Sequence, residues 1–195
     1  MEITIIIICL ILCAFFSGME IAFITSNKIY LEIEKKQDNL LSYILTKLTE
    51  KPSQFIATML IGFNVAIVVY SFFMGDLLMK WFETLGIEFS SLVNLLLQTV
   101  LSTLIVLFTS EFLPKVFFQI YANSFVKFFA IPAYIFYLLF YVVSTFIMWI
   151  SDTILKRFFK TEGDFVPLFF SKVELGNYIS EQMNHFEDHE NVDSE

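Results

Sequence analysis

The chain has 195 residues, of which 57% are hydrophobic, and phenylalanine alone occurs 25 times. Soluble domains contain roughly 45–50% apolar residues, so this composition indicates an integral membrane protein. The formal net charge is −8. Basic and acidic residues balance over residues 1–161, and the excess acid lies entirely in the remaining segment. Because no cationic surface is available to neutralise phosphates, binding to nucleic acid is not expected.

Four uncharged apolar runs set the predicted topology: residues 3–19, 52–75, 89–110 and 128–151. Each is long enough to be a candidate membrane span, which takes roughly 20 residues. The fourth run has Lys127 before it and further bases after it, and the positive-inside rule disfavours a simple crossing there. We therefore predict an all-α membrane protein with three transmembrane helices plus cytoplasmic juxtamembrane or re-entrant helices. Four crossings are the alternative.

The first helix, predicted over residues 3–25, carries polar groups at membrane depth. It follows a start without the basic segment of a cleaved signal, so we expect it to be retained. Ser17 and Glu20 are three residues apart and share a helix face, while Gly18 allows another backbone to approach closely. One interpretation is a packing notch at Gly18 with Glu20 reaching the interface. The other is that Ser17 and Glu20 face a polar cavity.

Residues 27–51 contain five lysines, which marks them as cytoplasmic and places the N-terminus outside and the C-terminus inside. Apolar residues recur there at nearly helical spacing, which predicts a helix along the inner membrane surface. Asn27 is placed to cap its start.

The second transmembrane helix is predicted to start at Pro52 and to end near residues 75–76. A loop over 81–88, which contains acids and no base, is then expected outside, with aromatic residues at the membrane interface. Gly62 and Asn64 lie in mid-membrane. Asn64 either forms a hydrogen bond between helices or offers its amide oxygen to a cation.

The third transmembrane helix is predicted from Ser90 to Glu111. A glutamate at the end of a membrane helix is costly unless a cation meets it. Pro114 disrupts the helical hydrogen-bond ladder and frees backbone carbonyl groups close to the Glu111 carboxylate. Lys115 follows as an anchor at the cytoplasmic side. Together with Ser110, these residues supply the hard oxygen ligands that suit Mg²⁺ or Na⁺.

Each of the three predicted spans therefore carries one polar cluster, around Ser17, Asn64 and Glu111. Such groups must find partners in hydrocarbon, and the available partners are one another or a bound cation. Hydroxyl, amide, carboxylate and carbonyl oxygens favour Mg²⁺, Ca²⁺ or Na⁺. Zinc is disfavoured, since His and Cys are absent from the cluster.

Residues 161–195 differ in composition from the rest and form a polar, acidic segment. His185 and His189 are four residues apart, but their acidic surroundings favour a solvated face over a metal site. We predict a membrane domain over residues 1–160 and an acidic cytoplasmic segment over 161–195.

Three short motifs resemble one family in order and spacing. They are Phe-Ser-Gly-Met-Glu at 16–20, Ile-Gly-Phe-Asn at 61–64 and Ser-Glu-Phe-Leu-Pro-Lys at 110–115. They resemble the membrane domain of the CorC/CorB and cyclin M (CNNM) magnesium transporters, also called haemolysin-like membrane proteins. The resemblance covers about residues 3–160.

The resemblance implies a homodimer in the cell membrane that transports or exports Mg²⁺ from an inward-facing cavity, with Na⁺ coupling as a further expectation. It implies no enzymatic activity. Ser17, Asn64 and Glu111 would supply ligand oxygens to Mg²⁺, and Gly62 and Pro114 would shape the backbone. Residues 161–195 resemble the start of the family's helical bundle. The CBS domains that follow the bundle are not in this chain, so nucleotide binding is not expected.

The chain departs from the family pattern at three positions. Met19 stands where a serine is usual, Phe63 where a first asparagine is usual, and Ser110 where a glycine is usual. Met19 and Phe63 offer no oxygen ligand at these two positions. The alternative is therefore a membrane assembly or scaffold protein that does not transport, like relatives linked to gliding motility. A Ser110–Lys115 hydrolase dyad is a third interpretation, but no oxyanion-hole motif supports it.

Overall fold

A computed structural model describes residues 2–37, 39–86 and 90–158, and every regular element within these ranges is helical. The predictions made for residues 161–195 lie outside the described residues. The elements, in chain order, are α1 (Glu2–Thr25), α2 (Lys28–Lys35), α3 (Leu40–Glu50), α4 (Pro52–Thr84), α5 (Ser91–Val106), the π-helix η1 (Leu107–Phe112), α6 (Leu113–Ile120), α7 (Ala122–Phe128), α8 (Ala130–Leu139) and α9 (Tyr141–Phe158).

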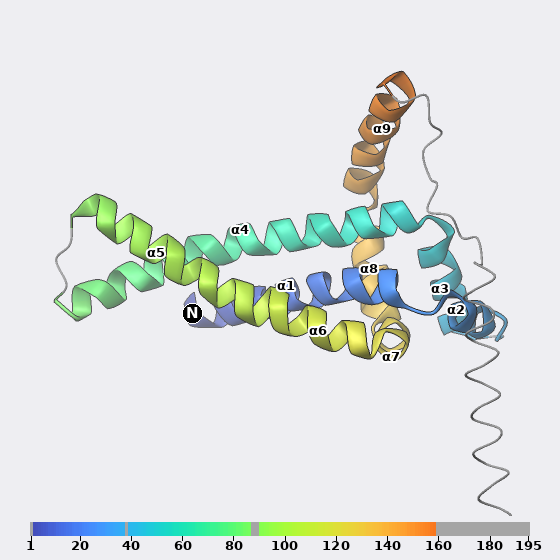
Figure 1. Ribbon diagram of the computed structural model, residues 1–195, viewed down its shortest axis with the longest axis horizontal. Helices are drawn as coiled ribbons and strands as arrows, with labels where there is room; N and C mark the ends of the chain where they lie inside the picture. The colour runs from blue at the N-terminus through green and yellow to red at the C-terminus, as the bar shows by residue number, and fades with distance from the viewer. Residues whose placement is uncertain (1, 38, 87–89, 159–195) are drawn as a thin grey trace, which may run out of the picture.

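Three helical stretches are long and apolar enough to cross a membrane: Glu2–Thr25, Pro52–Thr84 and Ser91–Ile120. The last is the continuous run of α5, η1 and α6. Figure 1 shows the three stretches extending along the same direction, with α2, α3 and α7 gathered at one end. The predicted all-α membrane architecture with three spanning helices is confirmed.

Helix α1 is the centre of the bundle and packs against α4, η1, α6 and α7. Two glycines permit this packing. A Cβ on Gly62 of α4 would lie 2.5 Å from the Phe16 ring of α1, and a Cβ on Gly18 of α1 would lie 2.7 Å from the Phe118 ring of α6. Ordinary carbon contacts are about 3.5–4.0 Å. Small residues let helices approach in a membrane, where packing drives association.

The predicted surface helix over residues 27–51 is instead two short helices, α2 and α3. Asn27 caps α2, as predicted, because its side-chain oxygen accepts hydrogen bonds from the backbone N–H groups of Ile29 and Tyr30. Asn39 begins α3 in the same way by accepting from Ser42 N–H. The second cap explains the break, since a capping asparagine needs extended backbone at its own position.

The predicted end of the second span near residues 75–76 is wrong, because α4 continues to Thr84. Lys80 forms ion pairs with Asp76, four residues earlier on α4, and with Glu2 at the start of α1. Charge pairs at this spacing stabilise a helix. Gly86, at φ 65°, ends the segment with the left-handed backbone that favours glycine.

Residues 128–151 do not form one straight helix. They belong to α7, α8 and α9, and α7 and α8 are bent by 63° relative to each other. Figure 1 shows α8 and α9 lying across the bundle rather than along it. This arrangement fits the predicted juxtamembrane or re-entrant helices. The chain has a fourth span only if the bent pair α7–α8 counts as one crossing.

Candidate functional site

The third span is irregular where the sequence places Glu111. Residues Leu107–Phe112 form a π-turn. After it, the N–H of Leu113 donates to the carbonyl of Phe108, five residues back. The carbonyl of Thr109 thereby loses the donor that an α-helix would give it, and Pro114, the next candidate, has no N–H. The interruption predicted from Pro114 is present, and π-turns of this kind occur frequently at functional sites.

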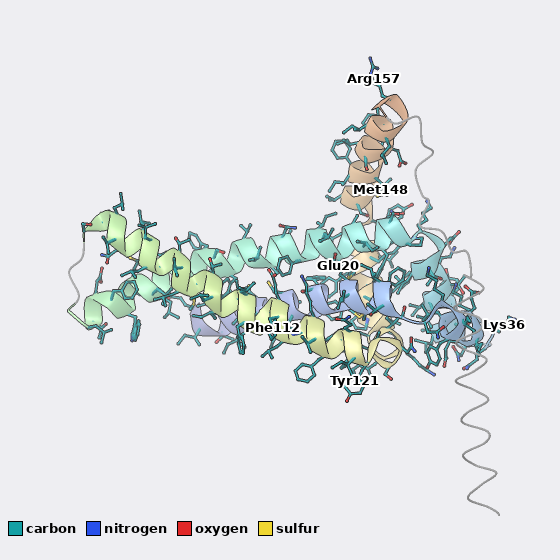
Figure 2. All side chains as sticks on the ribbon, viewed as in Figure 1. Glu20, Lys36, Phe112, Tyr121, Met148 and Arg157 are labelled. Carbon is teal, nitrogen blue, oxygen red and sulfur yellow. The ribbon has the colours of Figure 1, made fainter. Side chains whose placement is uncertain are left out.

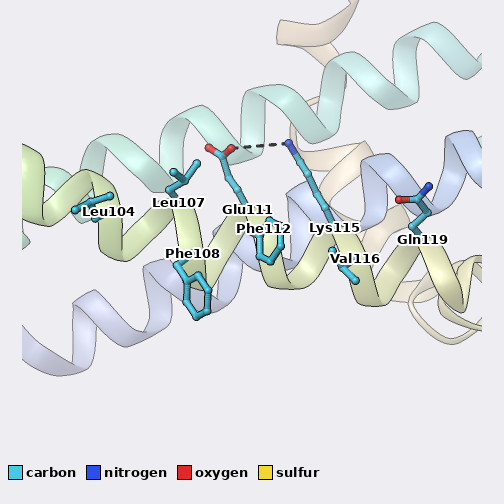
Figure 3. Close-up of a pocket in the computed structure, with 8 residues that line it drawn as sticks. All are labelled: Leu104, Leu107, Phe108, Glu111, Phe112, Lys115, Val116 and Gln119. Carbon is cyan, nitrogen blue, oxygen red and sulfur yellow. Dashed lines mark ion pairs between the residues drawn. The ribbon is translucent and has the colours of Figure 1, made fainter.

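Glu111 points out of this π-turn beside Lys115. The Glu111 carboxylate oxygen lies 3.9 Å from Lys115 Nζ, close enough to attract but too long for a hydrogen bond (Figure 3). Both side chains line a cavity of about 600 Å³ whose other walls are mostly apolar. The Glu111 side chain is 30% exposed. Its carboxylate is therefore accessible and only loosely neutralised.

One face of α1 accompanies this segment. The Ser17 side chain is 2% exposed, and its hydroxyl oxygen has no hydrogen-bond partner among the described residues. Helix α1 packs against η1 and α6, and Gly18, the residue after Ser17, meets the Phe118 ring of α6. The opposite charges of Glu20 and Lys115 are near enough to attract each other. The structure thus brings the Ser17–Glu20 face of α1 alongside Glu111 and Lys115.

Ser110 has a structural role. Its hydroxyl donates to the carbonyl of Leu10 in α1 at 3.0 Å, and the side chain is fully buried. The bond holds the π-turn against α1. It also fixes the next residue, Glu111, on the neighbouring face of the third span.

Asn64 does not join this group within one copy of the chain. A residue two positions along a helix is turned by roughly 200°, and Gly62 faces α1. Asn64 is accordingly exposed, donates to the backbone carbonyl of Leu60 at 2.7 Å, and lines a separate hollow between α4 and α9. Its predicted role as a ligand beside Ser17 and Glu111 stays a prediction.

Two of the three positions that depart from the family pattern, 19 and 63, are filled by apolar packing. Met19 is fully buried in the main core with Phe16 and Met59, and Phe63 packs against the same cluster. Position 63, rather than 64, is therefore the asparagine position of the motif that turns toward the core. Sequence reasoning missed this, because the rotation of α4 against α1 is set by the contact of Gly62 with Phe16.

The available ligand set is small. Within the described ranges, no group of three or more His, Cys, Asp or Glu side chains is placed to hold a metal ion. What α1 and the π-turn offer together is the Glu111 carboxylate, the Ser17 hydroxyl and the Thr109 carbonyl. These are hard oxygen donors. Such a set suits Mg²⁺, which retains several water ligands and is usually held by one or two carboxylates.

Comparison with known proteins matches nearly the whole chain to one family of membrane domains. The profile of the cyclin M transmembrane N-terminal domain matches residues 4–190. No curated protein matches the chain significantly. The matched domain is of a transporter type and is not a known enzyme family; it is associated with the transport of metal ions across membranes. With nearly its full length matched, the chain belongs to the cyclin M transmembrane domain family.

Proposed function

We propose that this protein transports Mg²⁺ across the cell membrane through a site centred on Glu111. The observation that carries the proposal is the loosely neutralised carboxylate on a π-turn that packs against α1. Helix α1 carries the buried Ser17 hydroxyl, which has no partner among the described residues. An unpartnered hydroxyl in a membrane core is costly, and a bound cation or its water would satisfy it. The match to a family associated with metal-ion transport supports the same assignment.

The charge balance at Glu111 gives the mechanism. With no cation bound, Lys115 is the nearest positive charge at 3.9 Å. An arriving Mg²⁺ replaces Lys115 as the partner of the carboxylate, and the lysine side chain, 46% exposed, is able to swing away. Return of Lys115 then competes with the ion and favours its release. A site of few protein ligands also avoids the complete dehydration that Mg²⁺ resists.

The charge distribution supports an orientation of the chain in the membrane. Helices α2, α3 and α7 lie at one end of the bundle (Figure 1). They carry Lys28, Lys35, Lys47 and Lys127, so this is the cytoplasmic end by the positive-inside rule. This orientation puts the N-terminus outside, and the inward-facing state that we propose would open the Glu111 site toward the cytoplasmic end. Na⁺ moving down its gradient is a suitable driving ion for Mg²⁺ efflux, because the same oxygen ligands bind it.

The outer surface of the third span fits a homodimer. Figure 2 shows side chains projecting from the outer side of α5 and α6. The apolar ones exposed there are Leu96, Val100, Leu104, Phe108, Phe112 and Val116. Glu111 is 30% exposed on this span, and polar groups of this kind avoid direct contact with lipid. A second copy that covers this surface would remove Glu111 from the hydrocarbon.

The test is Mg²⁺ flux in proteoliposomes that contain the purified full chain. Glu111→Gln keeps the size of the side chain and removes the charge, so we expect flux to fall by at least about tenfold, which corresponds to ~1.4 kcal/mol. Glu50→Gln is the matched control, since Glu50 is an exposed partner of Lys47 at the end of α3. Equal flux for wild type and Glu111→Gln would overturn the proposal.

A second candidate function rests on Met19 and Phe63. Both place apolar side chains in the core at positions where the family motif has oxygen ligands. This favours a membrane scaffold that keeps the fold without transport. It predicts no Mg²⁺ flux for wild type, no Mg²⁺-dependent thermal shift, and a stable membrane partner that co-purifies with the chain.

A further inference from the structure

Helix α5 carries a polar stripe that none of the preceding roles uses. Asn94, Gln98 and Ser102 recur every four residues, and the same spacing continues through Val106 to Ser110 beside the candidate site. Residues four apart share one face of a helix. The stripe therefore runs along α5 from the connection with α4 toward Glu111.

Contacts show that this face of α5 meets α4. The Tyr70 hydroxyl of α4 donates to the backbone carbonyl of Ser102 at 3.0 Å in a buried position. A Cβ on Gly75 would lie 2.2 Å from Gln98 Nε2, so the Gln98 amide lies directly against the α4 backbone at Gly75. The Oδ1 atom of Asn94 is buried and has no hydrogen-bond partner among the described residues.

The opposite face of α5 has a different character. It exposes Leu95, Leu96 and Val100, and its Thr99 hydroxyl donates to the helix's own Leu95 carbonyl. A hydroxyl satisfied by its own backbone is compatible with lipid. Polar side chains are thus concentrated where α5 faces α4. Intramembrane polar groups that face the bundle interior typically mark the pathways of ions and substrates.

An apolar cluster closes the stripe before it reaches Ser110. Val106, 5% exposed, is buried with Cys9 of α1 and with Tyr70 and Met74 of α4. Tyr70 donates to Ser102, and Met74 adjoins Gly75, which meets Gln98, so these two residues lie along the stripe. Val106 is the apolar residue between Ser102 and the π-turn. It separates the outer half of the α4–α5 contact from the Glu111 cavity in the conformation seen here.

We propose that the α4–α5 contact is the outer leg of the cation path, with Asn94, Gln98 and Ser102 as its polar lining and the Val106 cluster as its seal. This proposal rests on the proposed transport function. A hydrated divalent cation that leaves Glu111 toward the outside needs oxygen groups along its way. Asn94 Oδ1, the Gln98 amide oxygen and the Ser102 hydroxyl supply them once α5 separates from α4 at Val106.

Water access to the leg is testable without measuring transport. Gln98→Cys and Ser102→Cys are compared with Val100→Cys on the lipid-facing side. Each is measured against the parent chain, which keeps Cys9 and Cys13 because Cys9 belongs to the seal. A charged, membrane-impermeant methanethiosulfonate is added from outside. Because only thiolate reacts and it forms in water, the two stripe positions should react at least about tenfold faster than Val100→Cys. Equal, slow reaction at all three positions would overturn the outer leg.

Measurements of Mg²⁺ flux distinguish the proposed outer leg from the proposed Glu111 site. Gln98→Leu and Asn94→Leu should each lower Mg²⁺ flux about tenfold, or ~1.4 kcal/mol, while Thr99→Val on the opposite face leaves it unchanged. Normal flux in both leucine variants, together with loss in Glu111→Gln, would refute the leg and keep the proposed function. Fast labelling of Gln98→Cys, together with no Mg²⁺ flux in the wild-type chain, would support an aqueous leg and refute Mg²⁺ transport.

Discussion

The close approach of α1 and α4 at Gly62 makes a quantitative prediction. A Cβ added there would lie 2.5 Å from Phe16 Cε1 and 2.6 Å from Cζ. The Phe16 ring is 2% exposed and is held by the Phe136 ring, with centroids 4.8 Å apart. To regain an ordinary contact of about 3.5 Å or more, the ring must move by roughly 1 Å into a packed cluster.

We expect Gly62→Ala to destabilise the protein despite the better helix propensity of alanine. Overpacking of this kind costs about 1–3 kcal/mol, and the gain in propensity offsets up to ~1 kcal/mol. A net loss near 1–2 kcal/mol corresponds to a fall in Tm of about 2–8 °C for a chain of this size. Thermal unfolding of the purified protein in one detergent, followed by circular dichroism, measures it.

Two further variants control this prediction. Gly75→Ala meets only the flexible end of Gln98, so its Tm should fall less than that of Gly62→Ala. Phe16→Leu removes ring atoms from the contact, and combined with Gly62→Ala it should be more stable than the sum of the two single changes predicts. If Gly62→Ala is as stable as wild type, and the double variant shows no coupling, α1 and α4 do not approach closely at Gly62.

Two other predictions concern charge. Lys115→Gln removes the positive charge that competes with Mg²⁺ for Glu111. The affinity for Mg²⁺ should therefore rise about five- to tenfold, near the ~1 kcal/mol expected for two charges 4 Å apart in water. Weaker Mg²⁺ binding in a calorimetric titration would contradict competition between Lys115 and the ion. The hydrogen bond from Lys127 holds the pKa of Glu34 below its ordinary value. The pair therefore stabilises the folded protein fully at pH values above the pKa that Glu34 has in the unfolded chain. This stabilisation is lost as the pH falls through the lower pKa that Glu34 has in the folded protein. Glu34→Gln should therefore have a lower Tm than wild type at pH 7, with the gap closing below about pH 4, and a gap that is constant with pH would contradict the assignment.

Much of the architecture could be predicted because the membrane restricts the choices. Uncharged runs of sufficient length identify the three spans, and the lysines of residues 27–51 identify the end at which the short helices gather. The end of α4 could not be read from hydropathy. Ion pairs of Lys80 with Asp76 and with Glu2 extend the helix, and Glu2 lies far from Lys80 in the sequence.

The candidate site was predictable in part for a related reason. Pro114 predicts a broken hydrogen-bond ladder, and the spacing of Glu111 and Lys115 predicts their pairing. The face on which Asn64 lies depends on how α4 is rotated against α1. That rotation is set by the contact of Gly62 with Phe16, which only the folded structure reveals.

The central claim is that the Glu111 carboxylate binds the transported cation. The most direct test measures the Tm of the purified wild-type protein at increasing Mg²⁺ concentrations. A ligand that binds only the folded state raises Tm as the ligand concentration rises. We predict a Mg²⁺-dependent rise in Tm for wild type and for Glu50→Gln, and none for Glu111→Gln. The same rise in Glu111→Gln as in wild type would contradict the claim.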